Sequence, residues 1–128
     1  AISSTRRLVR AGELAFLSEH DTANPQRLAA ALAKRGAIAV VTRAEHGALL
    51  YTGETVHAFP AVPANQVEPT GAGDCFATSF TLRYHETGSL EEAMRFGLAA
   101  GSLAVEGRGV AGIPDRGAIE QRARQVAA

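Results

Sequence analysis

The segment VEPTGAGDCFATSF, residues 67–80, decides how this chain is interpreted, because an extended stretch containing proline changes there into helical spacing. The proline that follows Glu68 disfavours helical backbone at Glu68 itself. After the glycines, Phe76 and Phe80 lie four residues apart, as side chains on one face of an α-helix do. The segment therefore predicts a helix whose first turn contains GAGD.

Two interpretations of GAGD stay open on residue types alone. The first turn of a helix has unpaired backbone N–H groups and partial positive charge, so it can bind an anion. Gly71 and Gly73 have no Cβ, so a phosphate can approach their backbone, and the Asp74 carboxylate can accept a proton from an attacking hydroxyl. Alternatively, the threonine-glycine turn and the aspartate only cap a helix. No Lys-Ser/Thr pair follows the glycines, so the motif is not a P-loop.

The sequence before this segment predicts a strand–helix–strand unit. ELAFLS at 13–18 is a short apolar run that ends in polar residues, which is typical of a strand leading into a loop. A helix is expected to begin at Asn24-Pro25 and to end at Gly36. AIAVVT at 37–42 is nearly all apolar and β-branched, as strands of a parallel sheet are.

Two further strands and three helices complete the predicted fold. GALLYT at 47–52 and TVHAFP at 55–60 are expected to form a hairpin. The helix after GAGD should end at Gly88, and Ser89 should cap the next one, with Glu92 completing a capping box. A last helix is expected near Pro114-Asp115. The fold class predicted is α/β, a mostly parallel sheet flanked by helices, with functional loops at the carboxyl ends of its strands.

Composition limits the classes of partner. The 128 residues include thirteen basic and thirteen acidic side chains, so the net charge gives no reason to expect nucleic acid or an anionic membrane. The single cysteine excludes an internal disulfide and fits a cytoplasmic protein. The chain has no initiator methionine and enters directly on a helix-like segment, so we expect a fragment or the ordered part of a longer protein.

Three further features favour structural roles. The four histidines do not have the spacing of zinc ligands. Cys75 is expected to pack under the GAGD turn rather than to act as a reactive thiolate. Arg122 and Arg124 are interpreted as a solvated face of the last helix.

The segment VEPTGAGDCFATSF resembles the second signature of the ribokinase-like, or PfkB, family of carbohydrate and nucleoside kinases, whose usual form is aspartate-threonine-x-GAGD-x-F. The resemblance extends through AIAVVTRAEHGALLY, SLEEAMRFGLAAGSLAVEGRG and GIPDRGAIEQR, and so covers nearly the whole chain. It implies a ribokinase-like fold, of which residues 1–128 would be the C-terminal, nucleotide-binding part. The half that carries the sugar-binding residues and the β lid does not appear here.

The resemblance also implies roles for particular residues. Asp74 would be the catalytic base, and the amides of Gly71, Ala72 and Gly73 would be the anion hole. Ser18 and Asp21 stand where the family has an Asn-x-x-Glu motif near Mg²⁺, so one of its carboxylates, that of Asp21, remains. In family members that bind K⁺, the carbonyls at the positions of Glu68 and Thr70 would hold that ion. The residues matching the nucleotide contacts of the family are Thr42, Ala44, Leu98, Ala99, Gly107 and Gly109. Arg43 would either close over the nucleotide or point to solvent.

The resemblance implies an ATP-dependent phosphotransferase that uses Mg²⁺ and moves the γ-phosphate to a hydroxyl of a sugar, a polyol or a nucleoside. A homodimer is conceivable for the full-length parent. Two alternatives remain: a nucleotide-binding module without catalysis, motivated by the altered LSEHD and TRAEHG loops, and an inactive fragment in which TGAGD only caps a helix.

Overall fold

The structure is a computed structural model that describes residues 12–19, 23–43, 46–62, 72–106 and 115–126. The chain forms two compact units, Ala1–Phe59 and Pro60–Ala128. The first contains a sheet and one helix, and the second contains three helices. The predicted site residues Asp21, Ala44, Glu68, Thr70, Gly71, Gly107 and Gly109 lie outside the described residues.

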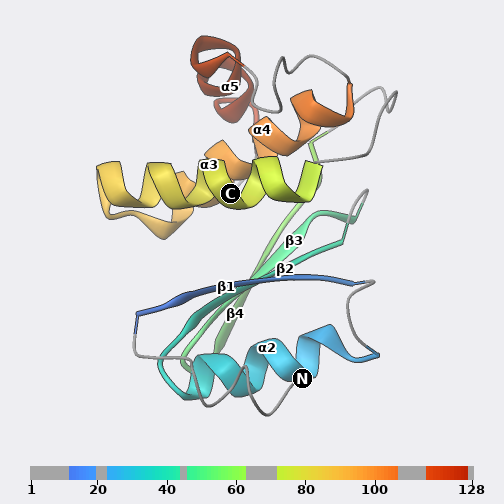
Figure 1. The fold of residues 1–128 in the computed structure, drawn as a ribbon, viewed down its shortest axis with the longest axis vertical. Coiled ribbons are helices and arrows are strands. Elements are labelled where there is room, and N and C mark those ends of the chain that lie inside the picture. The colour runs from blue at the N-terminus through green and yellow to red at the C-terminus, as the bar shows by residue number, and fades with distance from the viewer. Residues whose placement is uncertain (1–11, 20–22, 44–45, 63–71, 107–114, 127–128) are drawn as a thin grey trace. The chain divides into compact units, whose positions relative to one another are not determined.

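The first unit is a four-stranded sheet with the strand order β1-β2-β3-β4. Its strands are β1 (Leu14–Ser18), β2 (Ile38–Thr42), β3 (Ala48–Thr52) and β4 (Thr55–Phe59). Helix α2 (Pro25–Lys34) connects β1 to β2, which pair in parallel, and it lies across one face of the sheet (Figure 1). The predicted strand–helix–strand unit is confirmed.

Local sequence explains where α2 begins and ends. The Asn24 side chain accepts a hydrogen bond from the Arg27 amide at 3.1 Å, and proline follows at the first helical position. At the other end, Gly36 has a φ of 98°, a left-handed conformation that favours glycine. The amides of Gly36 and Ala37 then donate to the last turn, to the carbonyls of Ala33 and Leu32. This is a Schellman motif, and it returns the chain to the sheet.

The core of this unit lies between α2 and the sheet. Leu32 is fully buried, and a side chain of this kind stabilises the fold by about 1.5–3 kcal/mol. The small residues of α2 allow the helix to approach the strands closely. The buried members of this core are Ala29, Leu32, Ala33, Ala37, Ala39, Val41, Leu49 and Tyr51.

The predicted hairpin is confirmed, since β3 and β4 pair antiparallel with Thr52 opposite Thr55. However, β2 and β3 are also antiparallel. The α/β class is therefore confirmed, but the expectation of a mostly parallel sheet is corrected for the described strands, where one of three ladders is parallel. The physical reason is loop length, because only residues 43–47 join β2 to β3 and a parallel connection needs a dozen residues or more.

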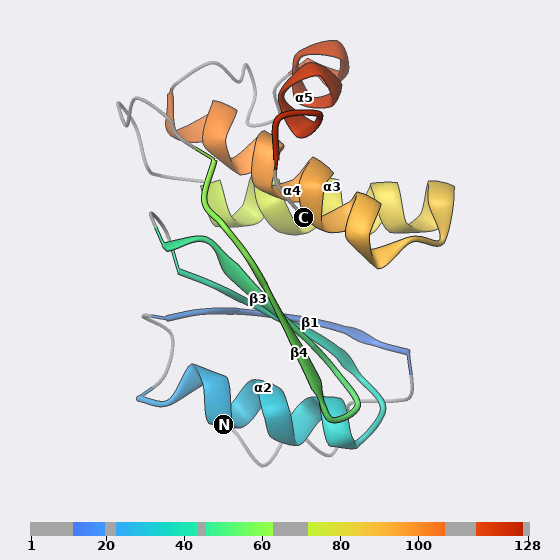
Figure 2. The same ribbon diagram turned by 180° about the vertical axis from the view of Figure 1, so that it is seen from behind.

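The second unit consists of α3 (Ala72–Thr87), α4 (Leu90–Val105) and α5 (Arg116–Ala123). Gly88, with a φ of 69°, ends α3, and the Ser89 hydroxyl accepts from the Glu92 amide at 3.2 Å to begin α4. In the predicted capping box, the Ser89 amide would donate to the Glu92 carboxylate. In the structure, the Ser89 amide donates instead to the Thr87 hydroxyl at 3.1 Å. Figure 2 shows α3 and α4 side by side, with α5 against α4.

A glycine allows the close packing of α3 on α4. A Cβ built on Gly97 would lie 3.2 Å from both the ring and the carbonyl oxygen of Phe76. The remaining contacts form a compact core between the three helices, consisting of Cys75, Phe96, Ala99, Ala100, Leu103 and Ile119. This core holds the first turn of α3 in place.

Candidate nucleotide and phosphate site

Two predicted residues of the first unit meet at the carboxyl ends of β1 and β2. Ser18 and Thr42 are opposite each other in the parallel ladder, and both are half-buried. The Thr42 hydroxyl donates to the Leu17 carbonyl at 3.4 Å, and the Glu19 amide donates to the Thr42 carbonyl at 3.1 Å. Glu19 and Arg43 therefore follow the two strands at the same edge of the sheet.

Arg43 bonds within its own loop. Its guanidinium Nη2 donates to the His46 carbonyl at 3.2 Å, and its amide donates to the Gly47 carbonyl at 2.8 Å. Burial raises the pKa of Tyr51 in β3, and the charge of the Arg43 guanidinium opposes that shift. The sequence leaves two positions open for Arg43, over the nucleotide or toward solvent. To close over a nucleotide, the Arg43 side chain would have to break its hydrogen bond to the His46 carbonyl.

The GAGD motif begins α3, as predicted. Ala72 is the first helical residue, and Gly73 and Asp74 are exposed in the first turn. A Cβ built on Gly73 would meet no atom of the described residues within 4 Å, so no described residue fills the space on that side of the glycine. In an α-helix, the amides of the first turn have no acceptor within the helix. Amides that lack an acceptor within the helix therefore lie in the same turn as an exposed carboxylate.

The next two residues fix this orientation. Cys75 and Phe76 are buried, and the Cys75 thiol donates to the Ala100 carbonyl with an Sγ–O distance of 3.6 Å. Burial raises the pKa of the Cys75 thiol, while a hydrogen bond with Ser79 opposes the shift. The prediction that Cys75 packs under the turn is thus supported. Because these residues face the core, Asp74 and Gly73 face away from it.

The predicted nucleotide contacts on α4 differ in accessibility. Leu98 is half-buried, whereas Ala99 is fully buried in the core of the three helices. The Ala99 side chain is therefore not accessible to a ligand in this structure, and Leu98 remains a candidate contact.

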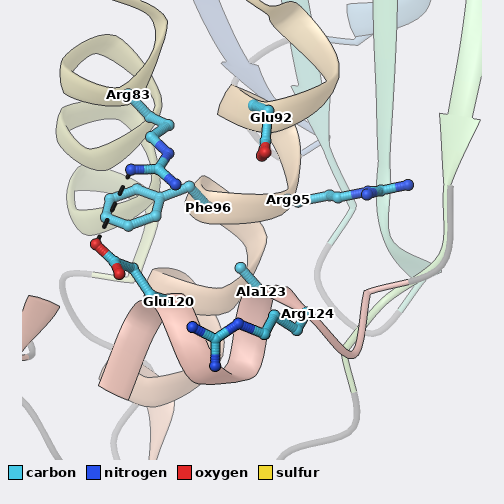
Figure 3. Close-up of a pocket in the computed structure, with 7 residues that line it drawn as sticks. All are labelled: Arg83, Glu92, Arg95, Phe96, Glu120, Ala123 and Arg124. Atoms are coloured by element: carbon cyan, nitrogen blue, oxygen red, sulfur yellow. Dashed lines mark ion pairs between the residues drawn. The ribbon is translucent and has the colours of Figure 1, made fainter. Parts of the chain in front are cut away.

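A pocket of about 180 Å³ lies farther along the same helices (Figure 3). The sequence analysis did not predict this pocket. The only signal for it in the sequence is the spacing of Arg83 and Glu86 and of Arg116 and Glu120, which is typical of ion pairs on one helix. Its lining consists of Arg83, Glu92, Arg95, Phe96, Glu120, Ala123 and Arg124.

One ion pair joins two residues that line this pocket. The Arg83 guanidinium lies 5.0 Å from the Phe96 ring centroid and 3.9 Å from Glu120 (Figure 3). Arg83 follows Asp74 by nine residues on α3, which corresponds to about 13 Å along the helix axis. The pocket is thus separate from the first turn of α3, and its lining contains three arginines and two glutamates.

Within the described ranges, no three His, Cys, Asp or Glu side chains gather closely enough to hold a metal ion. None of the helices in this part of the chain combines the length and the apolar character that crossing a bilayer requires.

Comparison with known proteins identifies the family. Residues 9–116 match the family described as pfkB family carbohydrate kinase. A cytidine kinase of Thermococcus kodakarensis is 44% identical over 64 residues, which are 48% of this chain and 23% of that enzyme. The ribokinase of Arabidopsis thaliana, solved with ribose and ATP, superposes with a TM-score of 0.76 at 26% identity, covering 93% of this chain and 43% of that one.

A putative ribokinase II of E. coli in complex with ATP and Mg²⁺ is similar with a TM-score of 0.78 at 26% identity, covering 96% of this chain and 42% of that chain. The chain therefore spans less than half the length of these relatives. The family match covers most of the chain, and the structural likeness covers nearly all of it. This chain belongs to the pfkB family of carbohydrate kinases.

Proposed function

We propose that this chain is the C-terminal, nucleotide-binding part of a longer kinase that transfers the γ-phosphate of ATP to a hydroxyl of a sugar, a polyol or a nucleoside. The family assignment supports phosphoryl transfer. Relatives named ribokinase and nucleoside kinase support this range of acceptors.

The observation that carries the proposal is the arrangement at the start of α3. Asp74 is exposed in the first turn, directly after Gly73, whose backbone is open on the side where a Cβ would stand. An anion at this end would receive backbone hydrogen bonds and the favourable end of the helix dipole. The carboxylate would then lie within the same turn as the transferred group.

The proposed chemistry uses these two features together. The acceptor hydroxyl gives its proton to the Asp74 carboxylate as its oxygen forms a bond to the γ-phosphorus. The bond between that phosphorus and the bridging oxygen breaks, and ADP leaves. Amides of Gly71, Ala72 and Gly73 stabilise the charge on the transferred phosphoryl group. Mg²⁺ bound with ATP would neutralise phosphate charge that otherwise repels Asp74.

Thr42, in the first unit, is also proposed to contact the nucleotide. It lies opposite Ser18 at the carboxyl ends of β2 and β1, where ligands of α/β proteins bind. Three further proposals rest on the family resemblance. In these, Asp21 supports Mg²⁺, the carbonyls of Glu68 and Thr70 hold K⁺, and the nucleotide is contacted by Ala44, Gly107 and Gly109. The homodimer proposed for the full-length parent has the same basis, whereas the proposed cytoplasmic location rests on the single cysteine.

The substitution Asp74→Asn tests the proposed base in the complete kinase. The amide keeps the size of the carboxylate and removes its ability to accept the proton, so turnover should fall at least about 100-fold. The affinity for ATP should stay within about twofold, because backbone amides rather than the carboxylate hold the phosphate. Steady-state kinetics and calorimetric titration with Mg-ATP measure the two quantities.

Asp115→Asn is the matched control, since Asp115 also begins a helix, where its carboxylate accepts from the Ala118 amide at 3.2 Å. Asparagine caps helices equally well, so this variant should keep full turnover. Equal turnover of the Asp74 variant and the wild type would refute the role of Asp74.

A nucleotide-binding module without catalysis remains the second candidate, because the LSEHD and TRAEHG loops depart from the forms that the family resemblance implies. Titration of the 128-residue chain with Mg-ATP tests whether binding needs the rest of a kinase. Saturable binding together with an inactive full-length protein would favour this module over the enzyme.

A further inference from the structure

Arg122 of α5 differs from the solvated arginine that the sequence predicts. Its side chain is 18% exposed, and its Nη1 atom lies 3.0 Å from a carboxylate oxygen of Glu106, whose side chain is 12% exposed. The same nitrogen donates to the Ser102 hydroxyl at 3.2 Å. Arg122 is thus bound at two points to the last turns of α4, and the expectation of a solvated face is wrong for this residue.

The contacts reach further into α4. The Ser102 hydroxyl donates to the Ala99 carbonyl at 2.7 Å, and Ala99 follows Leu98 directly. Glu106 is the C-cap residue of α4. A single guanidinium therefore links the turn after the predicted nucleotide contact Leu98 to the residue at which α4 ends.

Charge explains why this link is needed. The last turn of α4 contains no basic residue, although the carboxyl end of a helix carries partial negative charge. Glu106 adds a full negative charge at the same end. Arg122 supplies the positive charge from a neighbouring helix, in a half-buried setting where the pair is screened less than at the surface.

We propose that Arg122 is a positioning residue for nucleotide binding, acting through Glu106 and Ser102 on the end of α4. This inference rests on the proposed function, because Leu98, one helical turn before Ser102 on α4, is a predicted nucleotide contact. Arg122 itself touches no reacting group. It holds the carboxyl end of α4 in one position, so that the nucleotide does not have to order it on binding.

The experiment compares Arg122→Gln, Arg122→Lys and Glu106→Gln with the wild type in the complete kinase. Each is titrated with Mg-ATP well below its melting temperature, and the KM for ATP and kcat are measured in parallel. Arg122→Gln and Glu106→Gln should each weaken ATP binding and raise the KM by about tenfold, with kcat within about threefold. The double variant should be no worse than either single one, since both remove the same link.

Two variants separate positioning from general stability. Arg122→Lys keeps the charge and should restore at least half of the lost affinity on a logarithmic scale. Arg95→Gln is the matched control, because it breaks another arginine–glutamate pair of the same unit, with Glu91 at 2.7 Å, nearer the start of α4. It should leave ATP affinity within twofold of the wild type.

Two results would overturn the inference in different ways. If the wild type binds Mg-ATP and Arg122→Gln binds it equally well, with only a lowered melting temperature, Arg122 is structural and the proposed function stands. If the folded wild type binds no Mg-ATP at all, the proposed function fails, and this inference fails with it.

Discussion

Gly73 and Gly97 show how one residue type has two opposite uses within a single helical unit. Gly97 is required by packing, since a Cβ there would lie 3.2 Å from the buried Phe76. Gly73 has no such neighbour among the described residues, although glycine is a poor helix former. A glycine that costs helix stability and has no packing reason among the described residues is consistent with a ligand that approaches the backbone.

Gly73→Ala tests this interpretation. The free energy of unfolding should rise by about 0.5 kcal/mol, because alanine loses less backbone entropy in a helix. ATP affinity or turnover should nevertheless fall at least about tenfold, since the new methyl group would meet the bound phosphate. Urea unfolding and kinase assays give both quantities.

Gly97→Ala is the control for this prediction. Overpacking costs about 1–3 kcal/mol, which exceeds the gain in helix propensity, so the stability of this variant should fall. A Gly73→Ala enzyme with unchanged activity would show that no ligand approaches the first turn of α3 closely.

At the scale of elements, ion pairs attach α5 to α3. Glu86 accepts from Arg116 at 2.6 Å, and it also pairs with Arg83 at 3.4 Å. The hydrogen bond from Arg116 lowers the pKa of the Glu86 carboxyl, with smaller contributions from Arg83. Because the folded-state pKa is lowered, this contribution to stability is present above the ordinary pKa of glutamate. It is lost as the pH falls through the lowered value.

Arg116→Met should move the Glu86 pKa back up, close to its ordinary value, and flatten the acid side of the stability profile. A carbon-detected NMR titration of the side-chain carboxyl measures the pKa, and thermal unfolding between about pH 3 and pH 7 measures the profile. Arg95→Met is the control, since it breaks the pair with Glu91 on the surface of α4. An unchanged pKa of Glu86 in Arg116→Met would show that the ion pair does not form in solution.

At the scale of the whole molecule, charge balance governs association. The thirteen acidic and thirteen basic side chains give a formal net charge of zero and an isoelectric point near 7.1. A protein without net charge has little electrostatic repulsion between copies. We therefore expect the solubility of the 128-residue chain to be lowest near pH 7 and to rise on either side, as measured by light scattering.

Single charges at exposed positions should displace this minimum in opposite directions. Gln121 and Gln26 are exposed on α5 and α2. Gln121→Glu should move the minimum to lower pH, and Gln26→Lys should move it to higher pH. A minimum that stays in place in both variants would point to a specific contact between copies rather than to charge balance.

Much of this protein was determined by local sequence. Asn24, Gly36, Gly88 and Ser89 mark helix ends through caps and backbone conformations that involve residues only a few positions away, so these predictions were confirmed. The position of Asp74 in the first turn of α3 follows from the same kind of signal, and the GAGD signature indicated the family before any coordinates.

Tertiary structure decided what depends on residues far apart in the chain. The antiparallel pairing of β2 with β3 depends on a short loop and on the register of the sheet. Arg122 belongs to α5, whereas its two partners, Ser102 and Glu106, belong to α4 and its C-cap. The charge spacing along α5 fits a solvated Arg122 as well as it fits an Arg122 that is paired with another helix. The pattern of a helix shows which residues share a face, but it does not show which helix covers that face. Caps are therefore readable from the sequence, whereas contacts between helices require the packed structure.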